Sequence, residues 1–151
     1  MDAESNTSQT MKIDVPVWFT IIAGMALAWN LLGLAAVIMD FMMSAESIAS
    51  LPMEQQEMYA ARPSWVSFAS LLAVFAGTLG CAGLVMKRAW AKVILLLSLF
   101  GLIAQDIAFF VILDTASVYG GQVVFMQAIV FIIALGLLAL AHWATRKRWI
   151  S

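Results

Sequence analysis

The sequence predicts an all-α integral membrane protein, a four-helix transmembrane bundle with a short amphipathic surface helix in its first outer loop. Of its 151 residues, 64% are hydrophobic and 11% are charged, which is more apolar surface than a soluble domain of this size can bury. Four apolar stretches each reach the roughly 20 residues that cross about 30 Å of hydrocarbon as a helix. These predicted spans are residues 17–39, 65–86, 93–113 and 123–143.

The segments that flank the spans predict a single transmembrane domain, residues 16–145, between two cytoplasmic tails. Residues 1–15 are mostly polar, and the apolar run that follows is too long for the core of a cleavable signal peptide. Residues 146–151 form a short basic tail. Cys81 is the single cysteine, so no disulfide can form within the chain.

The first outer loop, between the first and second spans, predicts a short helix over residues 52–61 that Pro63 ends. Ile48, Leu51 and Met58 are placed to share one apolar face. We therefore expect this helix to lie on the outer surface or to cap the bundle. A solvated loop is the alternative interpretation.

The second span is rich in small residues at helical spacing. Ala73 with Gly77, and Ala76 with Gly80, are pairs of small residues four positions apart. Lipid gives helices no hydrophobic reason to associate, so small residues that permit close backbone approach mark helix contacts. The second span is thus predicted to be the central helix of the bundle, or the seam of a dimer.

The positive charges predict the orientation, because Lys and Arg in short loops stay in the cytoplasm. Arg62 is the only basic residue expected on the outer side, where Asp40 and several other acids also lie. We expect both termini to be cytoplasmic, on the side that collects Lys12, Lys87, Arg88, Lys92, Arg146, Lys147 and Arg148.

Tryptophans also cluster near the predicted membrane boundaries, where amphipathic rings prefer to lie. Trp65 falls near the outer boundary. Those expected at the cytoplasmic boundary are Trp18, Trp90, Trp143 and Trp149.

The candidate site residues are the strongly polar groups within the spans. Asp106 lies in the third span, about 5 Å outward of its midpoint at a rise of about 1.5 Å per residue. Asn30, Gln105 and Gln127 are also expected in the outer half of the membrane, where each can hydrogen-bond a carboxyl group. Trp29 is the fifth candidate, although core packing is the simpler role for it.

Two hypotheses explain Asp106. In the first it is a proton-coupling or ligand-binding acid, with Asn30, Gln105 and Gln127 lining its pocket, because ionisable groups inside membranes mark substrate and proton pathways. In the second it makes a structural hydrogen bond between two spans. Gln105 and Asp106 are adjacent and point about 100° apart on a helix, so one can face a partner helix while the other faces a cavity.

Several function classes lack the residues they require. The sequence has no His/Cys/Asp/Glu cluster at metal-ligand spacing, and its one histidine, His142, cannot build a catalytic triad at the opposite boundary. No glycine-rich phosphate loop follows a strand. The basic residues flank the spans rather than forming a nucleic-acid surface. We therefore predict no catalytic residue, metal, cofactor or nucleic-acid partner.

Four short motifs of the sequence stand out together. They are Trp29-Asn30-Leu31-Leu32-Gly33, Tyr59 with Pro63-Ser64-Trp65, Gly77 with Gly80-Cys81, and Lys87-Arg88-Ala89-Trp90-Ala91. In these motifs the chain resembles a group of short bacterial membrane proteins often labelled "sugar transporter". The resemblance covers nearly the whole chain and implies a bacterial inner-membrane protein with a role in solute transport. It assigns no site residue.

Together these observations predict a transporter or binding protein for a small solute such as a sugar. Four helices make a thin wall for a complete pathway, so we expect a homo-oligomer. The alternative is a non-catalytic accessory or assembly subunit that docks a larger membrane partner through the small residues of the second span. Small four-span multidrug exporters carry a coupling glutamate in the first span that this chain lacks. A membrane enzyme is the third choice.

Overall fold

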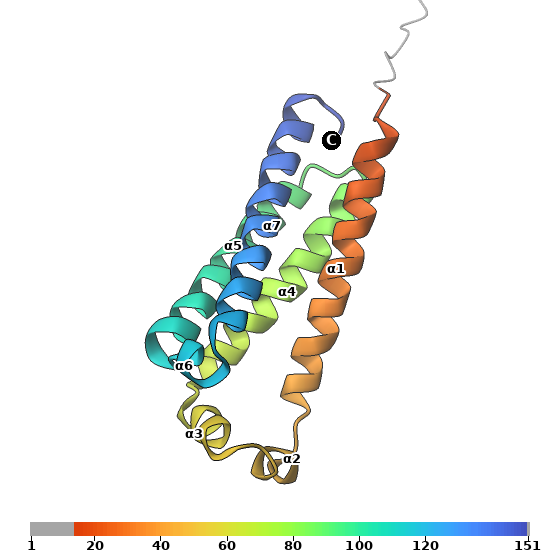
Figure 1. Cartoon of the computed structure of the whole chain (residues 1–151). Coiled ribbons are helices and arrows are strands. Elements are labelled where there is room, and N and C mark those ends of the chain that lie inside the picture. The colour runs from red at the N-terminus through yellow and green to blue at the C-terminus, as the bar shows by residue number, and fades with distance from the viewer. Residues whose placement is uncertain (1–13, 151) are drawn as a thin grey trace, which may run out of the picture.

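The computed structural model describes residues 14–150, which form only helices and their connections (Figure 1). The predicted polar tail therefore lies outside the described residues, apart from Asp14 and Val15. Four of the helical segments are long and apolar enough to cross a membrane, which confirms the all-α, multi-pass prediction. They are α1 (Val17–Phe41), α4 (Ser64–Val85), α5 (Ala91–Ile107) with its continuation η1 (Ala108–Ile112), and α7 (Gly121–Arg146).

Three short helices lie at one end of this bundle, which we call the loop end (Figure 1). α2 (Ala45–Ala49) and α3 (Met53–Ala61) connect α1 to α4, and α6 (Thr115–Tyr119) precedes α7. α3 contacts both α2 and α6. The opposite end, the termini end, holds the start of α1, the end of α7 and the turn between α4 and α5 (Figure 1). This arrangement follows from four antiparallel spans in sequence.

The central helix is α4, which packs against both α1 and α5, as its small residues predict. Its closest approach to α5 is at Gly101. A Cβ at this position would lie 2.8 Å from the backbone N of Ala73 and 3.1 Å from the carbonyl O of Ala69. Only a glycine fits against backbone atoms at such distances, so α4 and α5 form the tightest pair of the bundle.

α5 widens into a π-helical turn, η1, before the chain reverses direction. Such turns leave backbone groups without their ordinary helical partners. Here the Thr115 hydroxyl donates to the carbonyl O of Phe109 at 3.0 Å. Asp114 adopts a left-handed conformation with φ of 45°, which turns the chain into α6.

Aromatic packing closes the termini end. Trp18 of α1 stacks on Trp143 of α7 with ring centroids 5.7 Å apart. Trp149, beyond the end of α7, packs edge-on against Trp143 at 4.8 Å and against Phe19 at 5.7 Å. Ala23 of α1 and Ala141 of α7 lie in the same buried cluster. α1 and α7 are thereby joined at the termini end, and three of the tryptophans predicted at a membrane boundary pack against one another.

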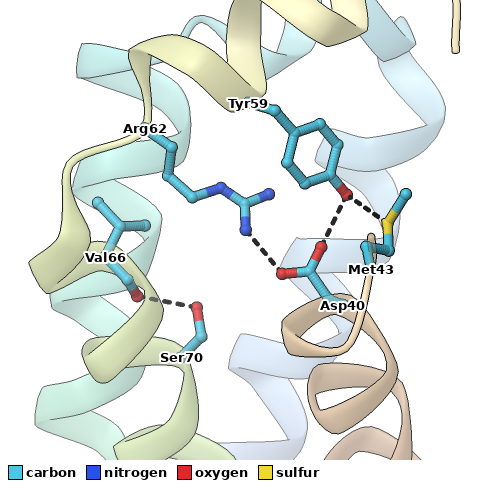
Figure 2. Close-up of polar contacts among 6 residues, drawn as sticks. All are labelled: Asp40, Met43, Tyr59, Arg62, Val66 and Ser70. Atoms are coloured by element: carbon cyan, nitrogen blue, oxygen red, sulfur yellow. Dashed lines mark hydrogen bonds and ion pairs between the residues drawn. The ribbon is translucent and has the colours of Figure 1, made fainter. Parts of the chain in front are cut away.

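At the loop end, a polar cluster ties α1 to the end of α3 (Figure 2). The carboxylate of Asp40, one residue before the end of α1, accepts a hydrogen bond from Arg62 Nη1 at 2.6 Å and one from the Tyr59 hydroxyl at 2.7 Å. The guanidinium carbon of Arg62 also lies 4.5 Å from the centroid of the Tyr59 ring. We call these three residues the latch.

The latch is partly shielded from water. The side chains of Arg62 and Asp40 are 16% and 33% exposed, and Arg62 Nε is buried without a hydrogen-bond partner among the described residues. Burial, and then the hydrogen bond to Asp40, raise the pKa of Tyr59 above its ordinary value. The phenol therefore remains a donor to the carboxylate across the neutral and mildly alkaline pH range.

We predict that Asp40→Asn lowers the free energy of unfolding by about 1–3 kcal/mol, because it leaves the partly buried guanidinium without its counter-charge. Reversible unfolding of the purified protein in mixed detergent micelles measures the effect. Glu54→Gln is the control, because Glu54 is an exposed acid on α3. Equal stabilities of Asp40→Asn and Glu54→Gln would contradict the latch.

Tyr59→Phe should destabilise the protein at neutral pH, because it removes the hydrogen bond to Asp40. The difference in stability between Tyr59→Phe and the wild type should disappear as pH rises through the raised pKa of Tyr59.

Candidate functional site

A cavity of about 360 Å³ lies among α1, α4, α5 and α7. Its volume falls within the roughly 300–1,000 Å³ that small-molecule sites occupy. Most of the wall is apolar, and every one of the four spans contributes to it. Its apolar residues include Leu32, Ala36, Val74, Leu102, Val130 and Ala134.

Asn30 of α1 presents an oxygen acceptor at the cavity wall. Its amide nitrogen donates to the carbonyl O of Ala26 at 2.9 Å and to Cys81 Sγ of α4 at 3.4 Å. Both amide hydrogens are thus used within the protein. The amide oxygen lies over Gly77, where a Cβ would overlap it. Gly77 therefore makes room for Asn30.

Two polar side chains of α5 share the cavity-facing side of that helix. The Ser98 hydroxyl donates to the carbonyl O of Ala73 at 2.6 Å, and its oxygen lies 3.1 Å from the position of a Cβ at Gly77. Gln105, two turns further along, borders the same cavity and is 9% exposed. Its side chain makes no hydrogen bond to any residue in the described range 14–150.

Gln127 of α7 completes the polar lining, and it connects the cavity to Asp106. Gln127 Nε2 donates to Asp106 Oδ1 at 2.6 Å. This contact is the hydrogen bond between two spans that the second hypothesis for Asp106 predicts. Asp106 itself does not border the cavity. The sequence placed it at the centre of the pocket, but the turn of about 100° per residue gives that place to Gln105 and directs Asp106 toward α7.

Trp29 borders the cavity and is 41% exposed, so core packing does not describe it. Four of the five predicted site residues, Trp29, Asn30, Gln105 and Gln127, therefore surround one cavity. Ser98, which also borders the cavity, was not among the predicted site residues. Its spacing of seven residues from Gln105, two helical turns, was the available signal.

The chemistry of the lining is that of hydrogen bonding without charge. None of the side chains that border the cavity is ionisable. Within the described residues, no group of three or more His, Cys, Asp or Glu side chains could hold a metal ion. Amides and a hydroxyl in an otherwise apolar cavity suit an uncharged ligand that has both polar groups and carbon surface.

Comparisons with known proteins do not assign this site. No family model, no curated protein and no solved structure matches the chain.

Gly77→Ala tests the cavity wall. The added methyl group would displace the Asn30 amide, so we predict a loss of about 1–3 kcal/mol in the free energy of unfolding. Gly24→Ala on α1 is the matched control, because a Cβ there meets no atom within 4 Å.

Combining Gly77→Ala with Asn30→Ala isolates the clash, because the smaller side chain leaves room for the new methyl group. The double variant should lose less free energy of unfolding than the two single variants lose in sum. Unfolding in mixed micelles measures all three losses. If Gly77→Ala costs no more than Gly24→Ala, Asn30 does not occupy the space beside Gly77.

Proposed function

We propose that this protein binds a small uncharged solute in the cavity among its four spans and carries it across the membrane. The observation that carries this proposal is the convergence of Asn30, Ser98, Gln105 and Gln127, from three helices, on one apolar cavity. Polar groups inside a membrane are costly and commonly face a substrate pathway. A sugar is the first candidate, because the resemblance to proteins labelled "sugar transporter" implies it.

The surroundings of the cavity also favour binding over a docking role. The accessory hypothesis required the small residues of the second span to be free for a larger partner. Instead, Gly77 faces Asn30 and Ser98, Gly80 faces Leu95, and Gly83 faces Trp90. These faces are filled within the chain, so the surface on which the accessory hypothesis depends is occupied.

We also propose that copies of the chain associate in the membrane. α1 and α7 leave most of their length uncovered, because only 11% and 6% of the residues in their most apolar 18-residue stretches are buried. These helices therefore contact lipid or a second copy. The cavity itself lies within one chain, so association would support the bundle rather than complete the site.

Filling the cavity provides the test of the proposed function. Ala134 borders the cavity from α7, so Ala134→Trp should block it, whereas Ala128→Trp places the same ring at an exposed position of the same helix that does not border it. We expect proteoliposomes with the wild type or Ala128→Trp to take up labelled monosaccharides and polyols, and those with Ala134→Trp to lose this uptake. Reswelling after osmotic shrinkage measures entry.

Two results would count against the proposal. Equal uptake by the two tryptophan variants would separate transport from the cavity. No uptake by any protein, together with stoichiometric co-purification of a larger membrane protein, would favour the accessory role. Thermal unfolding of both variants checks that each is folded.

We further propose a bacterial inner-membrane location with both termini in the cytoplasm and α3 at the outer surface. The basic residues that support this orientation gather near the termini end, in the turn between α4 and α5 and the first turn of α5, and at and just beyond the end of α7. Lys12, the remaining one, lies outside the described residues. At the loop end, Arg62 forms a salt bridge with Asp40.

Engineered cysteines test this orientation. Glu57→Cys at the loop end should react with a membrane-impermeant maleimide in intact cells, and Met86→Cys at the termini end should react only after permeabilisation. Both positions are exposed, and the wild type should stay unlabelled because Cys81 is buried. Labelling in the reverse order would overturn the proposed orientation.

A further inference from the structure

We propose that the cavity selects solutes by the hydrogen bonds that they donate, so that its ligand is rich in hydroxyl groups. This inference rests on the proposed function and names the substrate class of the same site. It follows from which hydrogens of the polar lining the protein already uses.

The first step concerns the wall formed by α1, α4 and α5. Asn30 uses both amide hydrogens on Ala26 O and Cys81 Sγ, and Ser98 uses its only hydroxyl hydrogen on Ala73 O. What remains is the Asn30 oxygen and the lone pairs of the Ser98 oxygen. Both oxygens lie next to Gly77, so two acceptors converge at one place in the cavity wall.

The second step concerns α7. Asp106 Oδ1 accepts a hydrogen bond from Gln127 Nε2 at 2.6 Å. This bond fixes which end of the amide faces α5, and it leaves Gln127 Oε1 as an acceptor for the cavity. Asp106 is thus a positioning residue, which acts on the solute through Gln127 without touching it.

The third step compares acceptors with donors. Oxygen acceptors, each with two lone pairs, remain on Asn30, Ser98, Gln105 and Gln127. The N–H donors that remain among the described lining residues are the two of Gln105, one of Gln127 and the indole N–H of Trp29, so lone pairs outnumber donors. A solute with hydroxyl groups satisfies this excess. A solute with acceptors alone leaves buried oxygens without partners, and unsatisfied polar groups lower affinity strongly.

The test compares two rings of the same size, cyclohexane-1,4-diol and cyclohexane-1,4-dione. The diol donates two hydrogen bonds and the dione none. Binding to the purified full-length protein in detergent is measured by calorimetry, with tryptophan fluorescence as a second readout because Trp29 borders the cavity. We expect the diol to bind at least about tenfold more tightly, as one or two net hydrogen bonds would give.

Two variants of Asp106 test the positioning step. In Asp106→Asn the amide oxygen still accepts from Gln127 Nε2, so the preference for the diol should persist. In Asp106→Leu the Gln127 amide is free to turn its N–H groups into the cavity, so the ratio of the two affinities should fall. A general loss of stability would weaken both ligands together and would leave their ratio unchanged.

The possible results separate this inference from the proposed function. Equal affinities for diol and dione in the wild type, both abolished by Ala134→Trp, would overturn donor selection while the binding site stands. Failure of both to bind, with Ala134→Trp identical to the wild type, would overturn the site and the selection together. The wild-type comparison requires no variant to fold.

Discussion

The backbone contact between α4 and α5 is the constraint on which the rest of the bundle depends. Gly101 brings α5 against Ala73 so closely that no side chain fits between them. One turn further along α4, Gly77 receives the amide of Asn30 from α1. Three spans are thereby joined along one central helix. α7 packs on α5 and joins α1 through the tryptophans at the termini end, which leaves the cavity among the four spans.

The sequence predicted the spans and the central helix because both depend on local properties. Length and hydropathy determine how many helices can cross a bilayer. Small residues at a spacing of four determine which helix others can approach, and Gly77 and Gly80 are used in this way. These signals lie within single helices, so no knowledge of the neighbours was required.

The site could be predicted only in part, because it depends on which helix faces meet. Polarity within the membrane identified Asn30, Gln105 and Gln127, and all three border the cavity. The sequence also placed Asp106 at the cavity. Because successive residues of a helix point about 100° apart, Gln105 borders the cavity and Asp106 does not. The pairing of Asn30 with Cys81 was not predictable, because it depends on the rotation of α1 against α4. A sequence alone does not contain that angle.

The side-chain hydrogen bonds divide the chain into two halves. Asn30 bonds to Cys81, and Asp40 bonds to Tyr59 and Arg62, all within the segment up to the end of α4. Asp106 bonds to Gln127 within the segment that follows. Among the described residues, the bond from Ser98 to Ala73 is the one side-chain hydrogen bond that joins the halves. During biosynthesis the first helical hairpin can therefore enter the bilayer with these polar groups already paired, before the ribosome has made the second.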